Sequence, residues 1–325
     1  MTPGWYRERP VLVLGGLGFI GRNLSRRLLA AGAKVTVVTP DRSVHAAEAA
    51  DLASSGASIV DADIRNGDAM RRLVREQDVL FHLSARSGAV RSVEDPFTDL
   101  DVNGRGSLVL LEAIRVENPR VHVVFAGTRL AYGRVGPEPV REDHPADPLC
   151  AHAVHKLMVE QHLRVYGRLF GMKSIVARIT NPFGPGQPAA RTDYGIINRM
   201  IHMAMRDRVL TVYGDGRQRR DYIYVDDAVE ALLRLGECAT DDVPVYNVGT
   251  GIGTAFIDMA QSIIAIAGSG RVERVEWPLL AEQIETGDFV ADISRIKEAV
   301  NWAPAVSLRE GLERTVSFYR AHLAS

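Results

Sequence analysis

The sequence predicts an α/β protein with a doubly wound parallel sheet and a smaller C-terminal α/β lobe. Three observations predict this fold class. Short apolar runs recur along the chain, stretches with helical spacing of apolar residues separate most of them, and a glycine-rich turn joins the first run to the first helix. The runs typical of buried strands are residues 11–14, 35–38, 59–64, 78–83, 121–125 and 174–178.

The first βαβ unit is the clearest. The run from Val11 to Leu14 predicts a strand that is buried on both faces. The helix predicted over 22–31 carries Leu24, Leu28 and Leu29 on one face and is followed by a glycine that ends it. Further helices are predicted over 106–116 and 152–170, between the later strands.

The turn of the first unit has glycines at 15, 18 and 21, between a strand and a helix. Glycine allows a tight backbone and leaves room for a pyrophosphate to approach. The helix that follows offers unpaired N–H groups and the positive end of its dipole. The turn therefore predicts dinucleotide binding and a Rossmann arrangement of the sheet.

Composition excludes several other classes of protein. The chain has 325 residues, is 46% hydrophobic and has a formal net charge of -1, so it lacks the basic footprint of a nucleic-acid-binding protein. Two cysteines exclude a disulfide framework. No signal segment and no apolar run of membrane-spanning length is evident, so we expect a cytoplasmic protein with no membrane partner.

Motifs in a fixed order identify a family. They are the glycine turn, Asp63-Ile64, His82-Leu-Ser-Ala85, the segment 103–107, the segment 178–187 (Arg-Ile-Thr-Asn-Pro-Phe-Gly-Pro-Gly-Gln) and the segment 213–227. With them the chain resembles the extended short-chain dehydrogenase/reductase family, in its nucleotide-sugar epimerase/dehydratase branch. The resemblance covers nearly the whole chain. It implies an NAD-binding domain over 1–180 and a nucleotide-sugar-binding lobe over 181–325, with the chain free to cross back between them.

The resemblance assigns the cofactor-binding residues. They are Gly15, Gly18, Phe19, Ile20, Gly21, Thr39, Arg42, Asp63, Ile64, Leu83, Ala85 and Lys156. The end of the second strand leaves the choice of dinucleotide open, because Thr39 stands where an acidic residue usually holds the adenine ribose. Asp41 is an alternative for that role, whereas Arg42 with Ser43 suits a 2′-phosphate. We expect NAD, which this branch mostly recycles, with NADP as the alternative.

The catalytic positions depart from the family pattern. The resemblance assigns catalysis to Thr128, to Lys156 and to a tyrosine four residues before the lysine, where this chain has His152. A spacing of four puts both side chains on one helix face, and the lysine charge favours a neutral imidazole that can act as a base. Lys156 is one of only four lysines among 39 basic residues, which supports a functional role.

Three roles for His152 compete. It replaces tyrosine as the acid/base; or it orients substrate while Tyr132, His155 or a water moves the proton; or it marks the loss of redox chemistry. His152 and His155 lie three residues apart, but no further ligand set accompanies them, so we predict no metal.

The resemblance assigns substrate contacts at Asn181, Asn198, Arg199, Tyr213, Arg220 and, in the segment 286–294, Asp288. Arg86 and Arg129 are further candidates, because they are basic groups at strand ends near the cofactor and can read the sugar or the phosphate. Arginine side chains such as Arg220 suit a diphosphate through charge-assisted hydrogen bonds. An arginine often found shortly before the segment 286–294 is missing here.

These residues predict an NAD-dependent epimerase of a nucleotide-diphospho-sugar that acts through a transient keto-sugar. Thr128 is followed by Arg129-Leu130 rather than by the acidic pair of the 4,6-dehydratases, which favours an epimerase over the alternatives, a dehydratase or a decarboxylase. The rival from another class is a non-catalytic dinucleotide-binding sensor or scaffold. We also expect a homodimer formed through the helices around 105–117 and 152–170, and a role in specialised metabolite biosynthesis. The nucleotide, the sugar and the carbon that reacts are not fixed by these motifs.

Overall fold

The computed structural model describes residues 4–136, 139–187 and 195–323. The chain divides into two compact units. The first contains residues 1–128, 150–178 and 229–246, and the second contains residues 129–149, 179–228 and 247–325. Each unit therefore combines segments that lie far apart in the sequence. The boundary at 180/181 that the sequence suggests for two functional domains stays a prediction.

The first unit is built on a seven-stranded sheet of order β10-β6-β5-β4-β1-β2-β3. Its strands are β1 (Pro10–Leu14), β2 (Lys34–Thr39), β3 (Ser58–Asp61), β4 (Val79–His82), β5 (His122–Thr128), β6 (Ser174–Ile179) and β10 (Val245–Val248). The pairs of β1 with β2, of β1 with β4, of β2 with β3 and of β4 with β5 are parallel. The predicted doubly wound parallel sheet is confirmed.

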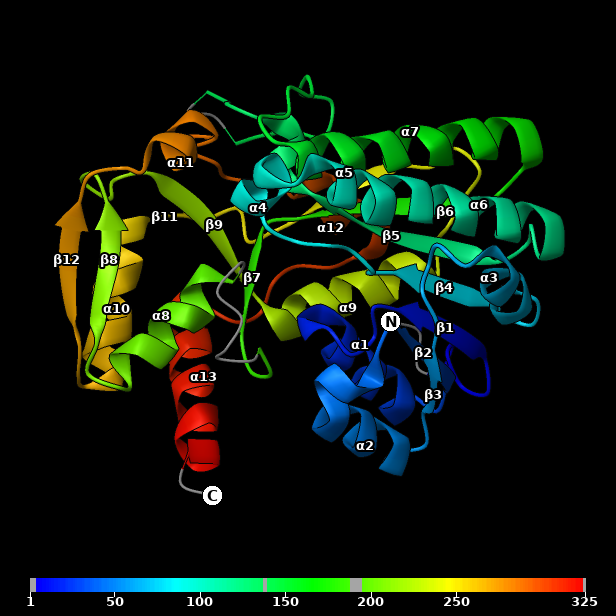
Figure 1. Ribbon diagram of the computed structural model, residues 1–325, viewed down its shortest axis with the longest axis horizontal. Helices are drawn as coiled ribbons and strands as arrows, with labels where there is room; N and C mark the ends of the chain where they lie inside the picture. Colours follow the sequence, from blue (N-terminus) through cyan, green and yellow to red (C-terminus); the bar gives the residue numbers. More distant parts are fainter. Residues whose placement is uncertain (1–3, 137–138, 188–194, 324–325) are drawn as a thin grey trace. The chain divides into compact units, whose positions relative to one another are not determined.

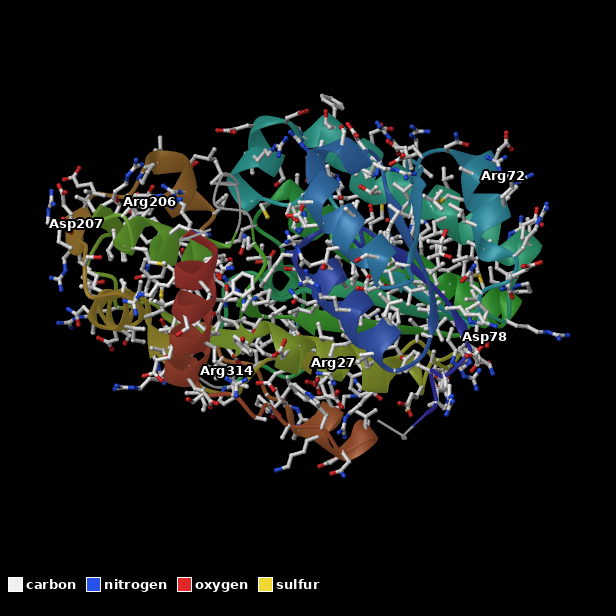
Figure 2. The ribbon with its side chains drawn as sticks, turned by 90° about the horizontal axis from the view of Figure 1, so that it is seen from below. Arg27, Arg72, Asp78, Arg206, Asp207 and Arg314 are labelled. Carbon is white, nitrogen blue, oxygen red and sulfur yellow. The ribbon has the colours of Figure 1, made fainter. Side chains whose placement is uncertain are left out.

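Helices of the first unit lie on both faces of this sheet, with α6 and α7 on one face and α1 on the other (Figure 1). They are α1 (Phe19–Ala30), α2 (Ala46–Ser54), α3 (Gly67–Val74), α4 (Ala89–Glu94), α5 (Pro96–Asp99), α6 (Gly106–Glu117) and α7 (Ala151–Phe170), with the short turns η1 (Arg42–His45) and η2 (Leu100–Arg105). The core between the sheet and α6 and α7 is apolar and buried, and it includes Leu12, Leu80, Leu110, Phe125 and Leu163. Charged side chains such as Arg27, Arg72 and Asp78 point away from it (Figure 2).

The second unit has its own small core. It contains a three-stranded sheet of order β11-β9-β7 and a two-stranded parallel sheet of β12 and β8. Its strands are β7 (Asn181–Phe183), β8 (Val209–Tyr213), β9 (Arg219–Tyr224), β11 (Gly253–Ala255) and β12 (Arg271–Val275). Its helices are η3 (Arg129–Tyr132), α8 (Ile196–Ala204), α10 (Phe256–Ala267), α11 (Leu279–Gln283), α12 (Ser294–Val300) and α13 (Leu308–Leu323), while α9 (Val225–Gly236) runs from this unit into the first.

None of the helices in the described ranges is long and apolar enough to cross a membrane. The cytoplasmic location stays a prediction.

Candidate active site

The glycine turn between β1 and α1 is closed by backbone contacts. Gly15 has φ +76°, and the N–H of Gly18 donates to its carbonyl oxygen at 3.0 Å. A Cβ on Gly21 would lie 2.2 Å from that same oxygen, and one on Gly15 would lie 2.9 Å from the backbone of Ser84. Only glycine fits both positions, because any side chain would push the turn off the sheet. The turn thus holds the start of α1 close to the ends of β1 and β4.

The start of α1 suits an anion. Gly18 is its N-cap, no side chain caps it, and its first turn has no acidic residue. The unpaired N–H groups and the helix dipole therefore remain available to a pyrophosphate. Phe19, at the first position of the helix, is buried, and Ile20 is half-buried. The residues present fit a dinucleotide, and this cradle is what the sequence predicts.

At the end of β2, charge pairing separates the two candidates for the adenine ribose. Arg42 Nε lies 2.5 Å from Asp61 Oδ2, and Arg42 Nη2 donates to the carbonyl of Ile59 at 3.1 Å. Asp41 accepts hydrogen bonds from Ser43, which hold the pKa of its carboxyl below the usual value. An arginine already neutralised by a carboxylate is a poor receptor for a 2′-phosphate, whereas an ionised carboxylate suits ribose hydroxyls. This arrangement favours NAD over NADP.

The other predicted cofactor residues lie near the ends of the strands. Thr39, the last residue of β2, is buried. The Asp63 carboxylate is held mainly by the Arg65 side chain, which lowers its pKa, and Ile64 beside it is buried. Leu83 continues from β4 and its N–H donates to the carbonyl of Leu14 at 3.0 Å. Ala85, two residues further on, is half-buried.

The helix α7 carries the two central candidates one turn apart. His152 is 8% exposed and Lys156 is 6% exposed. Lys156 Nζ donates to the carbonyl of Ala126 at 2.9 Å and lies 4.7 Å from the centre of the Phe125 ring. Burial lowers the pKa of Lys156 to about 8, against the opposing effect of Asp99 and Glu160. The lysine is therefore a buried cation at neutral pH, fixed on the end of β5.

His152 is enclosed by polar groups on its Nδ1 side. Nδ1 lies 3.1 Å from the carbonyl oxygen of Arg86, 3.3 Å from Asn103 Nδ2 and 3.8 Å from Asp99 Oδ2. The backbone N–H of His152 donates to Ser92 Oγ at 3.0 Å. In the described part of the chain, no hydrogen bond is formed at Nε2 of His152. The imidazole is thus anchored through one nitrogen and leaves the other for a reacting proton.

Asn103 ties this group together. Its Oδ1 accepts from the N–H of Arg86 at 2.8 Å, and its Nδ2 donates to the Arg86 carbonyl at 2.9 Å. The guanidinium of Arg86, a predicted substrate contact, pairs with Asp95 at 3.0 Å. Thr128, the last residue of β5, is half-buried. In the first unit the structure therefore brings His152, Asn103 and Arg86 into one hydrogen-bond network, with Lys156 one turn further along α7.

In the second unit, two buried arginines lie together. Arg129 Nη1 donates to Thr286 Oγ1 at 2.9 Å, and its Nε donates to Asn181 Oδ1 at 3.4 Å. Burial lowers the pKa of Arg129 to about 9, and the charge of Arg220 adds to the effect. Arg220 pairs with Glu285 and donates to the carbonyl of Gly287. Arg129, Asn181 and Arg220 are thus brought together, and their role as substrate contacts stays a prediction.

The remaining predicted residues of the second unit are placed differently. Tyr132 is fully buried and its hydroxyl donates to Asn247 Oδ1 at 2.7 Å, which leaves it poorly suited to move a substrate proton. Asn198 is buried; its Oδ1 accepts from the N–H of Gly184 and its Nδ2 donates to the carbonyl of Gly184. Arg199 is half-buried on α8. Two more residues lie at the surface: Tyr213, whose ring lies tilted against that of Trp277, and Asp288, which accepts from the N–H of Arg219.

Comparison with known proteins identifies the family of this chain. The family model of the NAD dependent epimerase/dehydratase family matches residues 11–249. The chain belongs to this family. Its cofactor is accordingly NAD. A protein named UDP-glucose 4-epimerase from Mycolicibacterium smegmatis is 33% identical over 319 residues, which cover 95% of this chain and 98% of the relative.

Solved structures of family members give the same picture. A UDP-glucose 4-epimerase from Thermotoga maritima, solved with UDP-glucose, is 30% identical with a TM-score of 0.87, over 97% of this chain and 99% of its own. One from Thermus thermophilus, solved with NAD, is 30% identical with a TM-score of 0.85, over 96% and 99% of the two chains. Other matching relatives are named as a dehydratase and a decarboxylase.

The structure adds residues that sequence reasoning missed. Asp99 lies between His152 and His155, and Glu285 pairs with Arg220. Both contacts join segments that lie far apart in the sequence, so no local spacing of residues predicts them. No group of three or more possible metal ligands is found among the described residues.

Proposed function

We propose that this protein is an NAD-dependent epimerase of a nucleotide-diphospho-sugar and that His152 is its acid/base in place of tyrosine. The single observation that carries the assignment of His152 is its anchoring: Nδ1 is held by the Arg86 carbonyl, and the imidazole stands one helical turn from the buried Lys156 cation. The substrate class rests on the family and on the names of its members.

NAD held at the start of α1 would supply the hydride chemistry, as acceptor of a hydride from a carbinol carbon of the sugar and as its donor to the resulting ketone. This chain supplies the proton chemistry. Nε2 of His152 takes the hydroxyl proton during oxidation and returns it during reduction, with Thr128 as a hydroxyl partner. Lys156 would hold the nicotinamide ribose of the bound cofactor and would keep a positive charge there. Reduction on the opposite face of the ketone inverts the carbon.

We assign the diphosphate to the second unit, with Arg129 as its main cation and Asn181 beside it; Arg220, which pairs with Glu285, joins them when the ligand displaces that carboxylate. Arg129 has no carboxylate within ion-pair distance among the described residues, so its buried charge is open to an anionic ligand. The residues at 129 and 130 favour an epimerase, because neither is an acid that drives elimination. The intact Lys156 and the arginine pair argue against a non-catalytic sensor, since a scaffold has no need of them. The role in specialised metabolism stays a prediction.

The test of the function is turnover of nucleotide sugars. The purified protein is incubated with UDP-glucose, UDP-galactose, UDP-glucuronate and dTDP-glucose, and products are separated by chromatography and identified by NMR. An epimer with no change of mass supports the proposal. Loss of water or of carbon dioxide would point to a dehydratase or a decarboxylase. NAD bound with no reduction and no product from any sugar would point to the sensor.

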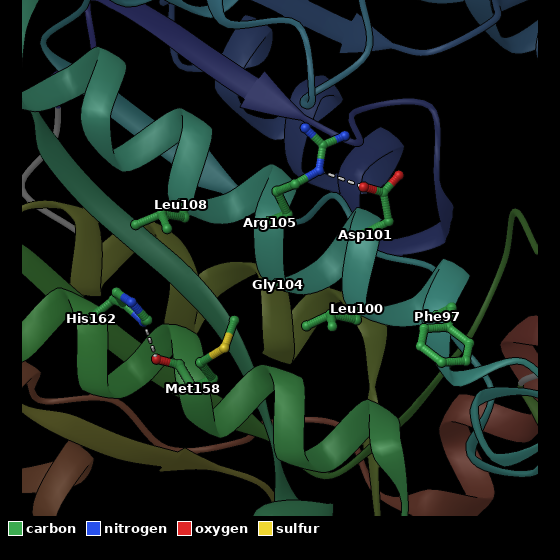
Figure 3. Close-up of a pocket in the computed structure, with 8 residues that line it drawn as sticks. All are labelled: Phe97, Leu100, Asp101, Gly104, Arg105, Leu108, Met158 and His162. Carbon is green, nitrogen blue, oxygen red and sulfur yellow. Dashed lines mark hydrogen bonds and ion pairs between the residues drawn. The ribbon is translucent and has the colours of Figure 1, made fainter.

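We also propose that two copies associate through the face of α5, η2, α6 and α7. This face has a cavity of 490 Å³ with an apolar lining that includes Leu100, Leu108 and Met158 (Figure 3). Phe97 at its rim is 84% exposed, and Leu169 further along α7 is 69% exposed. Such a patch is costly in water and fits a second copy of itself.

Light scattering after size-exclusion chromatography tests this association. We expect twice the chain mass for the wild type and a monomer for Phe97→Glu, because a carboxylate would have to be buried in the interface. Leu279→Glu is the matched control, since Leu279 is 72% exposed on α11 outside this face. A monomeric wild type would contradict the proposal.

A further inference from the structure

A buried carboxylate stands between two histidines of α7. Asp99, the last residue of α5, is 1% exposed. Its Oδ1 lies 2.6 Å from Nδ1 of His155, and its Oδ2 lies 3.8 Å from Nδ1 of His152. An ionised carboxylate only accepts hydrogen bonds, so His155 donates its Nδ1 proton to Asp99. His155 thereby fixes one oxygen of Asp99 and leaves the other beside His152.

Asp99 carries its negative charge in the folded protein. Burial raises the pKa of this carboxyl, but its interactions with His152, His155 and Asn103 outweigh the burial and set the pKa below the usual value. In the described part of the chain, no arginine or lysine lies within ion-pair distance of it. The charge of Asp99 is therefore directed at the two imidazoles rather than neutralised by a permanent cation.

The groups around His152 favour one tautomer. Two acceptors face Nδ1, the Arg86 carbonyl at 3.1 Å and the Asp99 carboxylate at 3.8 Å. The single donor near it, Asn103 Nδ2 at 3.3 Å, already donates to the Arg86 carbonyl at the shorter distance of 2.9 Å. A proton on Nδ1 satisfies both acceptors. Nε2 then has the unshared electron pair that a general base needs.

Other charged groups near His152 are committed elsewhere. The Arg86 guanidinium pairs with Asp95 at 3.0 Å, and Lys156 donates to the Ala126 carbonyl. Burial raises the pKa of the Cys150 thiol, which stays neutral. Asp99 is thus the anion that faces this imidazole from the elements packed on α7.

We propose that Asp99 is the positioning residue of His152: its carboxylate, fixed by His155, keeps Nδ1 protonated and balances the imidazolium that forms during the reaction. The proposal rests on the assigned role of His152. In the oxidation step the substrate O–H bond breaks and its proton goes to Nε2, while the C–H bond breaks and its electron pair goes to NAD as a hydride. Reduction returns both. Asp99 gains and loses no proton in either direction.

The test uses the NAD-bound protein labelled with ¹⁵N in its histidines, so it needs no substrate. We expect NMR to show His152 of the wild type as the Nδ1–H tautomer. In Asp99→Asn we expect a mixture of tautomers and a weaker affinity of the imidazole for its second proton, because the carboxylate beside Nδ1 is gone. Glu94→Gln, which removes an exposed carboxylate from nearby α4, is the matched control and leaves both unchanged.

A second readout is the pH profile of kcat with UDP-glucose. With the carboxylate gone, kcat falls at least about tenfold and its acidic limb moves to lower pH, because His152 holds its proton less tightly. A merely structural role would lower kcat without moving the limb. Asp99→Glu retains the negative charge, so we expect the acidic limb of its kcat profile at the wild-type pH. If Asp99→Asn does not fold, this variant tests the positioning role in its place.

The two failures are distinguishable. An Asp99→Asn protein with the wild-type tautomer and titration overturns the positioning role. A His152→Ala protein with wild-type turnover overturns the acid/base function on which that role depends.

Discussion

Replacing Lys156 by methionine should abolish turnover and yet stabilise the protein at neutral pH. Lys156 is a buried cation whose pKa falls from 10.5 to about 8. At 1.36 kcal/mol per pKa unit, the charged form costs the folded state about 3 kcal/mol at pH 7. Methionine has similar length and no charge. It leaves the Ala126 carbonyl without its hydrogen bond, which costs about 1–3 kcal/mol, so the net gain is about 1 kcal/mol.

The pH dependence gives a sharper number, because the cost of the lost hydrogen bond cancels. Between pH 8 and 10.5 the unfolded chain binds the lysine proton more tightly than the folded chain, so wild-type stability rises with pH in that window. From pH 7 to pH 10 this rise amounts to about 2.5 kcal/mol. Lys156→Met lacks this rise, so the variant should be more stable than wild type at pH 7 and less stable than wild type at pH 10.

Equilibrium urea unfolding of NAD-free protein at both pH values measures this difference, and removal of NAD excludes effects of cofactor binding. Lys173→Met is the matched control, since Lys173 is exposed and its charge is solvated in both states. The reasoning is refuted if the stability difference between Lys156→Met and wild type is the same at pH 7 and pH 10.

Three further predictions concern packing and charge. Arg178→Met should cost about 3–5 kcal/mol in urea unfolding, because the fully buried Glu160 carboxylate loses its partner at 2.6 Å; the double change with Glu160→Leu should recover most of this, and a full loss there would contradict the pairing argument. Gly21→Ala should abolish NAD binding in calorimetry and destabilise the turn by about 1–3 kcal/mol, whereas Gly67→Ala, with only an ordinary contact at 3.7 Å, should bind normally. Arg129→Met should raise KM for the nucleotide sugar at least about tenfold without loss of stability, because a charged partner of the ligand is removed and a desolvated cation is no longer buried; an unchanged KM would exclude a ligand contact.

Much of the first unit follows from local patterns. The strand predicted over 11–14 is β1, and the helices predicted over 106–116 and 152–170 are α6 and α7 within one residue at each end. The first helix begins at Phe19 rather than at Arg22, because the last glycine of the turn already has helical backbone. Glycine, apolar runs and helical spacing are local signals, and they place these elements accurately.

The candidate site was predicted less completely, for a physical reason. His152 and Lys156 share a helix, so their spacing gives their relation. The partner that orients His152 comes from α5, and only the packed fold brings Asp99 to it. The burial of Tyr132 against Phe289 and its hydrogen bond to Asn247 likewise depend on tertiary contacts, so its unsuitability as a base was not visible in the sequence.

The central claim is that His152 moves the substrate proton. The most direct measurement is the turnover number of His152→Ala on the nucleotide sugar that the wild type epimerises, with NAD saturating and with Gln161→Ala, an exposed position on the same helix, as control. We predict a loss of about 10²–10⁴-fold in kcat for His152→Ala, the range for removal of a general acid/base, with little change for the control. A kcat of His152→Ala within about threefold of wild type lies far outside this predicted loss and would contradict the account.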